Sequence, residues 1–127
     1  DLYNYSNCIN PAILEYLKTA QKPTTVVYEE AKNLPAKLIH EDGTIAIRLV
    51  KDEFCINLIE ALGHPLVSTS ANISGQATPI YFENISPEIK NAVDYIVQQR
   101  SKEIKKNVSS SSIIKIDKDG KIIVLRP

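Results

Sequence analysis

Residues 65–75 read Pro65-Leu66-Val67-Ser68-Thr69-Ser70-Ala71-Asn72-Ile73-Ser74-Gly75, a short apolar run that passes directly into small hydroxyls, an amide and a glycine. We interpret this stretch as a buried strand that ends in a ligand loop, because hydroxyls, an Asn side chain and closely spaced backbone N–H groups can surround an anion or a nucleotide. A polar turn is the alternative, since Ser, Asn and Gly are also common in ordinary turns. The composition of the stretch does not decide between the two.

Two elements upstream of this stretch indicate an α/β fold. Residues Thr44–Val50 form a nearly continuous apolar run, which predicts a strand. Asp52 is expected to cap a helix that Gly63 ends, with apolar residues at helical spacing between them (Phe54, Leu58, Ile59 and Leu62). A strand, a helix and a second strand in succession imply a sheet that helices bury. Ligands in such sheets tend to bind beyond the carboxyl ends of the strands, where the loop of residues 68–75 is expected.

The rest of the chain supplies further predicted elements. Asn10 and Pro11 are a helix start, and the β-branched run Thr24–Tyr28 predicts a strand. Ser86 followed by Pro87 predicts a short helix, and residues 93–97 predict another strand. Near the end, the runs 113–116 and 121–126 flank the turn 117–120, which predicts a hairpin.

Composition describes one ordinary globular domain. The 127 residues are 43% hydrophobic, and fifteen basic residues balance fifteen acidic ones, so the net charge favours neither nucleic acid nor a membrane surface. Cys8, Cys55, His40 and His64 are isolated, which indicates reduced thiols and no metal site built from His and Cys. With no long apolar run and no targeting segment, we expect a cytoplasmic protein. The chain contains no methionine, so we expect a fragment of a longer protein.

Three polar features have more than one interpretation. Arg48 lies inside an apolar strand, so it lies either at a sheet edge or beside a carboxylate or phosphate. Arg126, at the end of the last strand, raises the same question, with simple exposure as the ordinary explanation. The basic segment of Arg100, Lys102, Lys105 and Lys106 is either a solvated connection or a patch that contacts RNA phosphates.

Five segments resemble one family, in the same order. They are Lys22-Pro23-Thr24-Thr25-Val26-Val27, Gly43-Thr44-Ile45-Ala46-Ile47-Arg48, the stretch Ser68–Gly75 with Thr78-Pro79, Ser111-Ser112-Ile113-Ile114, and Leu125-Arg126-Pro127. Together they resemble the YrdC/TsaC family of threonylcarbamoyl-adenylate synthases, whose loop signature is S-x-S-A-N-x-S-G followed by [ST]-P.

The resemblance implies a single YrdC-like domain, with a mixed twisted sheet flanked by helices (α/β, or α+β in some schemes). Residues 1–127 would be the carboxyl-terminal two thirds of that domain. The amino-terminal third, which in the family carries a P-T-[ED]-T segment and a K-x-R phosphate motif, is expected to lie outside this sequence.

The resemblance also implies a nucleotidyltransferase that joins L-threonine, bicarbonate and ATP into threonylcarbamoyl-AMP and releases pyrophosphate, with Mg²⁺ expected. The product would pass to downstream threonylcarbamoyl-transfer proteins that modify a tRNA adenosine. The threonine-binding residues would be Arg48, Ser68 and Ser111. The ATP-binding residues would be Thr44, Ser70, Asn72, Thr78 and Arg126. We see no nucleophile with its base, so these residues are assigned to binding and positioning.

Two other functions are open at this point. The same fold is associated with binding of double-stranded RNA or tRNA, for which the basic segment Arg100–Lys106 is the support in the sequence. A related carbamoyl-transfer protein that carries this domain beside others is the second alternative.

Overall fold

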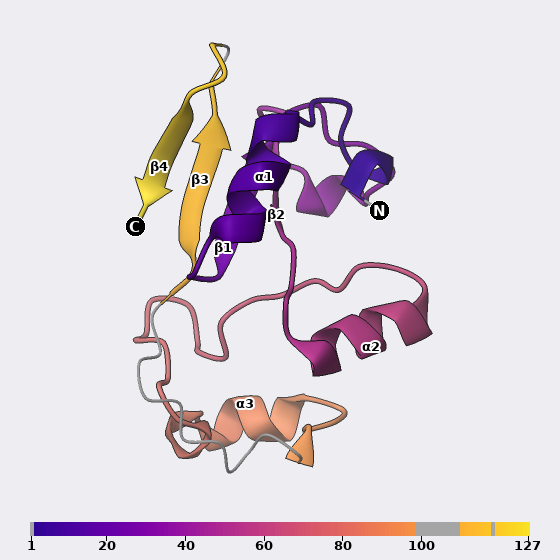
Figure 1. The fold of residues 1–127 in the computed structure, drawn as a ribbon. Coiled ribbons are helices and arrows are strands. Elements are labelled where there is room, and N and C mark those ends of the chain that lie inside the picture. The colour runs from indigo at the N-terminus through magenta and orange to yellow at the C-terminus, as the bar shows by residue number, and fades with distance from the viewer. Residues whose placement is uncertain (1, 99–109, 118) are drawn as a thin grey trace. The chain divides into compact units, whose positions relative to one another are not determined.

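The computed structural model describes residues 2–98, 110–117 and 119–127 (Figure 1). The chain forms two compact units, Asp1–Leu58 with Ser110–Pro127, and Ile59–Ser109, which we describe separately as the first and second unit. The expectation that residues 1–127 form a single domain stays a prediction. The elements in chain order are η1 (Leu2–Asn4), α1 (Pro11–Thr19), β1 (Thr24–Tyr28), η2 (Ala36–Leu38), β2 (Ile45–Arg48), α2 (Glu53–Leu62), η3 (Phe82–Asn84), α3 (Pro87–Ala92), β3 (Ser112–Ile116) and β4 (Ile122–Arg126).

A four-stranded mixed sheet organises the first unit. Its order is β2-β1-β3-β4, with β1 antiparallel to β2, β1 parallel to β3, and β3 antiparallel to β4 (Figure 1). The parallel pair joins Thr24 to Ser112 and Val27 to Lys115, so the middle of the sheet is made of segments far apart in the sequence. The predicted α/β class and mixed sheet are confirmed.

Helix α1 covers one face of the sheet. It begins at Pro11 because the Asn10 side chain accepts a hydrogen bond from the Ala12 backbone N–H at 2.9 Å, as predicted. Its buried residues pack with the sheet in the core of the unit, which consists of Leu2, Ile13, Leu17, Val26, Tyr28 and Ile114. At the other end of α1, Lys51 Nζ donates to the Ala20 carbonyl at 3.0 Å and to the Lys18 carbonyl at 3.4 Å. The ammonium therefore satisfies carbonyls that the last turn leaves without helical partners.

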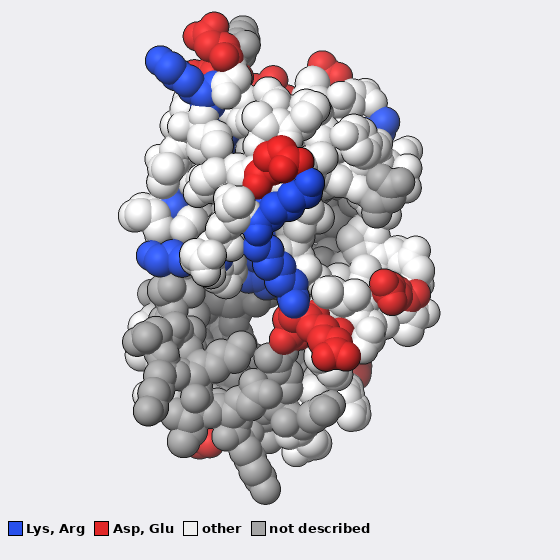
Figure 2. Space-filling view, viewed as in Figure 1, with Lys and Arg blue, Asp and Glu red and all other residues white. Residues whose placement is uncertain are grey.

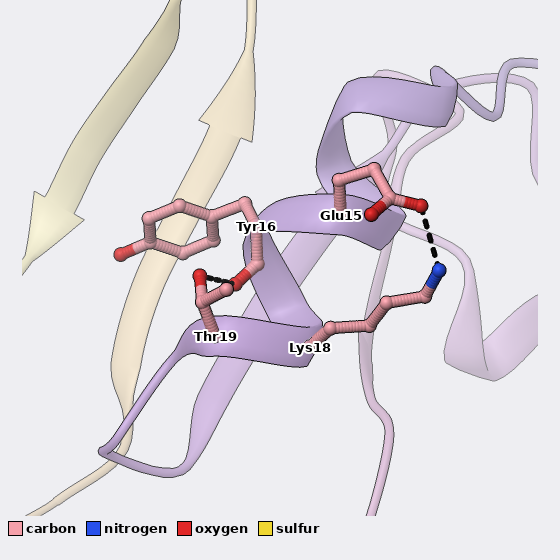
Figure 3. A network of polar contacts seen from close by, with 4 residues as sticks. All are labelled: Glu15, Tyr16, Lys18 and Thr19. Atoms are coloured by element: carbon pink, nitrogen blue, oxygen red, sulfur yellow. Dashed lines mark hydrogen bonds and ion pairs between the residues drawn. The ribbon is translucent and has the colours of Figure 1, made fainter.

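The outer surface of α1 carries a small polar network (Figure 3). Lys18 Nζ lies 2.6 Å from Glu15 Oε1, and Thr19 Oγ1 donates to the Tyr16 carbonyl at 3.0 Å (Figure 3). The side chains of the ion pair are 69% and 72% exposed. Exposed pairs contribute between roughly 0 and 1 kcal/mol, so packing against the sheet is what holds this helix.

Several predicted caps and turns are confirmed. The Asp52 carboxylate accepts from the Cys55 N–H at 3.0 Å at the start of α2, and Ser86 Oγ accepts from the Ile89 N–H at 3.3 Å at the start of α3. Gly63, at φ 72°, ends α2 as expected. In the β3–β4 turn, Asp117 Oδ1 accepts from the N–H groups of Asp119 at 3.0 Å and Lys121 at 2.8 Å.

Two predicted strands are wrong. In the part of the chain that the structure describes, neither residues 65–75 nor residues 93–97 contain a strand, and Val67 and Tyr95 are 73% and 78% exposed. A strand needs a neighbour to bind its N–H and C=O groups, and neither segment has one. The predicted strand Thr44–Val50 is shorter than expected, because β2 spans Ile45–Arg48.

Predictions from the sequence also concern cysteines, metal ligands, membrane-spanning helices and a basic segment. Neither Cys8 nor Cys55 forms a disulfide bond with a described residue. Within the described ranges, no His, Cys, Asp and Glu side chains form a group of three or more that could hold a metal ion, and no helix has the length and apolar character to cross a membrane. The basic segment Arg100–Lys106 lies outside the described residues, so its two interpretations stay open.

The hairpin offers a matched test of which sheet face carries the core. Ile114 is 0% exposed and Ile123 is 37% exposed. We expect Ile114→Ala to lower the free energy of unfolding by about 2–5 kcal/mol, because it leaves a cavity under α1, and Ile123→Ala to lower it by less than about 1 kcal/mol. Urea unfolding followed by circular dichroism measures both. Equal losses in the two variants would contradict the assignment of the core to one face.

The buried Tyr28 makes the free energy of unfolding of the first unit depend on pH in the alkaline range. Burial raises the pKa of Tyr28 to about 12, and the hydroxyl has no hydrogen-bond partner among the described residues. The unfolded phenol ionises near pH 10, so the stability due to Tyr28 is fully present below about pH 10 and is lost as the pH rises towards about 12. We expect Tyr28→Phe to be at least as stable as the natural protein at pH 7 and to lose less stability between pH 10 and 12. Urea unfolding of both proteins at several pH values tests this, and parallel losses would contradict it.

Candidate functional site

The side of the sheet opposite α1 carries a row of polar groups at one end. Thr24, Val26 and Tyr28 of β1 are buried on the α1 side, so Thr25 and Val27 lie on the opposite side by strand alternation. The β1–β2 register pairs Thr25 directly with Arg48. Directly opposed residues share a sheet face, which places Arg48 beside Thr25.

Ser111 joins this row through a hydrogen bond with Thr25. The two hydroxyl oxygens lie 3.0 Å apart, although the residues are 86 positions apart in the sequence. The contact follows from the parallel pairing of β1 and β3, because Ser111 directly precedes β3 and Thr24 pairs with Ser112. Two strands thus bring together two hydroxyls that no local pattern connects.

Arg126 reaches the same group from β4. Its Nη2 donates to the Ser111 carbonyl at 2.8 Å and to Ser111 Oγ at 3.4 Å, and its Nε donates to the carbonyl at 3.1 Å. A register shift precedes this contact: Ile114 pairs with Val124, but Ile113 pairs with Arg126. Without that one-residue shift Ile113 would face Leu125, and Arg126 would lie on the α1 side of the sheet. The shift therefore turns the guanidinium towards Thr25 and Ser111.

The row is suited to an anion. Neither guanidinium forms an ion pair with any described residue, and the Arg48 side chain is exposed and has no hydrogen-bond partner in that part of the chain. The Nη1 group of Arg126 likewise has no partner among the described residues, so its two N–H donors are available. The backbones of β2 and β4 are three strand spacings apart, about 14 Å, which leaves space between the arginines. Arginine binds carboxylates and phosphates through paired donors.

The sequence left open whether Arg48 lies at a sheet edge or beside a carboxylate or phosphate. Strand β2 is at an edge of the sheet, and Arg48 is exposed there, so the edge interpretation is the one that the structure confirms. An exposed edge position does not conflict with anion binding, because the Arg48 guanidinium has no partner among the described residues. We call the row of Arg48, Thr25, Ser111 and Arg126 the hydroxyl–arginine row.

Thr44 lies apart from this row. It directly precedes β2, four residues from Arg48, or about 13 Å along an extended chain. Its hydroxyl donates to Asp42 Oδ1 at 2.7 Å, and its N–H donates to the same oxygen at 3.1 Å. These two bonds lower the pKa of the Asp42 carboxyl, which is a turn residue as expected. The Thr44 proton is thus already in use, although its oxygen can still accept.

The other candidate residues belong to the second unit. Ser68, Ser70 and Thr78 are exposed there. Asn72 Nδ2 donates to the carbonyls of Ile73 and Gln76, each at 3.1 Å, so this amide braces its own loop. The Gln76 N–H donates to the Ile73 carbonyl at 2.9 Å, and Gly75 has φ 83° between them. Residues 73–76 are therefore a turn that requires positive φ at Gly75, so the polar-turn interpretation is confirmed for these four residues, and ligand binding by the stretch stays a prediction.

Thr25 was not among the binding residues predicted from the sequence. A threonine in the β-branched run Thr24–Tyr28 has an ordinary explanation in strand propensity. The available signal was the alternation of the run, which places Thr25 on the face opposite Val26. Its partner Ser111 could be found only from the pairing of β1 with β3.

On the face of the protein that Figure 2 shows, the charged side chains of the described residues lie in small groups. On the face shown in Figure 2, Lys and Arg side chains lie among Asp and Glu side chains without a large area of one sign. This agrees with fifteen basic and fifteen acidic residues in the chain. Attraction of an anion to the hydroxyl–arginine row would depend on local guanidinium groups rather than on a field over the whole surface.

Comparisons with known proteins identify relatives across bacteria and mammals. The family model Sua5/YciO/YrdC, described as telomere recombination, matches residues 1–127. A threonylcarbamoyl-AMP synthase of Pseudoalteromonas translucida is 36% identical over 75 residues, which cover 59% of this chain and 40% of that protein. One of Idiomarina loihiensis is 32% identical over 77 residues, covering 61% of this chain and 41% of that protein.

A third relative extends the similarity over the whole chain. The threonylcarbamoyl-AMP synthase of Mus musculus is 29% identical over 133 aligned residues, covering 100% of this chain and 46% of that protein. The chain thus spans about half the length, or less, of these curated relatives. No solved structure matches significantly. Because the family model matches the chain from its first residue to its last, the chain belongs to the Sua5/YciO/YrdC family.

Proposed function

We propose that this chain forms part of a threonylcarbamoyl-AMP synthase, which makes threonylcarbamoyl-AMP from L-threonine, bicarbonate and ATP. The observation that carries the proposal is the hydroxyl–arginine row, in which Ser111 and Arg126 are hydrogen-bonded and Arg48 lies opposite Thr25. It is supported by family membership and by relatives that are named threonylcarbamoyl-AMP synthases. In the cell the product would be used to modify a tRNA adenosine.

The structure of the product defines what the site must do. The threonine nitrogen forms a bond to the bicarbonate carbon with loss of water, and an oxygen of the resulting carbamate attacks the α-phosphorus of ATP. The bond from that phosphorus to the bridging oxygen breaks, and pyrophosphate leaves. These steps need alignment of two anionic substrates and neutralised phosphate charge more than a protein nucleophile.

At the threonine end, Arg48 binds the amino-acid carboxylate through charge-assisted hydrogen bonds. Ser111 offers its hydroxyl from the same face of the sheet, and Ser68 of the second unit is assigned to the same substrate. The free state of the Arg48 guanidinium supports this role, because an exposed arginine without a protein partner among the described residues can bind a carboxylate without breaking an existing bond.

At the ATP end, Arg126 directs its Nη1 donors to phosphate oxygens while Ser111 fixes the rest of the guanidinium. Thr44, Ser70, Asn72 and Thr78 complete the proposed nucleotide contacts. The described residues offer no cluster of three metal-ligating side chains, so Mg²⁺ would arrive held mainly by the ATP phosphates, as it commonly is. It would neutralise phosphate charge there.

Release of pyrophosphate tests the activity. We expect the full-length protein to release pyrophosphate from ATP in a reaction that requires both L-threonine and bicarbonate. Replacing L-threonine by L-threoninol, which lacks the carboxylate, is expected to abolish the release, because Arg48 then has no anion to bind. Release that ignores threonine or bicarbonate would rule out the proposed synthase.

Arg48→Ala should separate threonine binding from ATP binding. We expect the KM for threonine to rise about 10-fold to 100-fold, the effect of losing one charge-assisted hydrogen bond of about 1.5–3 kcal/mol, and the KM for ATP to change less than about threefold. Lys37→Ala is the matched control, because it removes one positive charge from the exposed turn η2. Kinetics with each substrate varied in turn measure both constants. An unchanged threonine KM in Arg48→Ala would exclude Arg48 as the carboxylate ligand.

A further inference from the structure

We propose that Thr25 is a positioning residue, which holds the Ser111 hydroxyl ready to contact the amino-acid substrate. The inference deepens the proposed function and rests on it. It starts from the contact of 3.0 Å between Thr25 Oγ1 and Ser111 Oγ, which neither the family resemblance nor the spacing of residues in the sequence assigns to any task.

Ser111 occupies a place where the sheet alone does not fix its side chain. It directly precedes β3, and the pairing of β1 with β3 begins one residue later, at Ser112. Two side chains compensate for this. Arg126 binds the Ser111 carbonyl at 2.8 and 3.1 Å, and Thr25 binds its hydroxyl. The backbone and the side chain of Ser111 are thus held separately, by different residues.

Thr25 is well placed to act as the fixed member of the pair. It lies inside β1, between buried Thr24 and Val26, and its branched side chain has few rotamers. The neighbouring Thr24 hydroxyl donates to the Lys22 carbonyl at 3.0 Å, so it is directed to the backbone. Thr25 therefore supplies the hydroxyl with which β1 orients Ser111.

The hydroxyls of Thr25 and Ser111 together offer one hydrogen-bond donor to a ligand. Arg126 can only donate, so Nη2 uses one acceptor site of Ser111 Oγ. Thr25 and Ser111 have two hydroxyl protons, and their mutual hydrogen bond uses one of them. One O–H donor remains, on the face of the sheet that also carries Arg48 and Arg126. That donor suits a carboxylate oxygen or another anionic acceptor of the substrate, and it is directed only while the Thr25–Ser111 bond is intact.

Two variants separate the hydroxyl of Thr25 from its bulk. Thr25→Val keeps the branched shape and the strand propensity but removes the oxygen, and Thr25→Ser keeps the oxygen but removes the methyl group. In the full-length protein we expect Thr25→Val to raise the threonine KM about fivefold to tenfold, the effect of one neutral hydrogen bond, and to change the ATP KM less than twofold. Thr25→Ser should stay within about twofold of the natural protein for both. Urea unfolding checks that both variants fold.

A second readout needs no substrate. Three-bond couplings between Hα and Hβ of Ser111, measured by NMR, report whether its side chain holds one rotamer. We expect a single rotamer in the natural protein and in Thr25→Ser, and averaged couplings in Thr25→Val. A single rotamer in Thr25→Val, or a failure of Thr25→Ser to restore threonine kinetics, would overturn the positioning role. If Ser111 behaves as expected but the natural protein shows no reaction with threonine, then the proposed function fails while the positioning of Ser111 by Thr25 stands.

Discussion

The parallel pairing of β1 with β3 is the constraint on which the first unit depends. It joins residues 24–27 to residues 112–115, and β1 also binds β2 while β3 also binds β4. The two central strands carry Val26 and Ile114, both almost completely buried under α1. The loop entropy lost in bringing such distant segments together grows only slowly with loop length, so one well-packed pair of strands can offset it. The contact between Thr25 and Ser111 on the opposite face of the sheet follows from this pairing.

Local signals in the sequence predicted the local elements well. Capping residues such as Asn10, Asp52 and Ser86 act through neighbouring N–H groups, so their effect can be read from a few adjacent residues. The two wrong strand predictions, within residues 65–75 and at residues 93–97, failed for the opposite reason. A strand exists only with a partner, and apolar composition over a few residues says nothing about whether that partner is available. Strand order, which depends on pairing alone, was not predicted beyond a mixed sheet.

The candidate site likewise contains some residues that could be identified from the sequence and others that could not. Arg48, Ser111 and Arg126 could be named from family-like segments, and the structure brings them into one row with Thr25. Thr25 also lies in a family-like segment, Lys22–Val27, but the resemblance assigned it no role, and its contact with a hydroxyl 86 residues away is visible only in the structure. The predicted loop of residues 68–75 keeps its polar character, but the turn at residues 73–76 and the Asn72 amide, rather than a strand, give it order. The roles at Ser68, Ser70, Asn72 and Thr78 stay predictions.

The register shift between β3 and β4 limits how this part of the chain can vary. Because Ile113 pairs with Arg126 instead of Leu125, the side to which the last arginine points depends on one extra residue in the strand. A hairpin usually tolerates changes of length at its tip, here the turn that follows Asp117, where Asp119 and Gly120 are exposed. An insertion or deletion between Val124 and Arg126 is different, because it would exchange the sides of the sheet on which Leu125 and Arg126 lie. Length variation in this hairpin should therefore be confined to the turn, and the interval after Val124 should act as a fixed spacer.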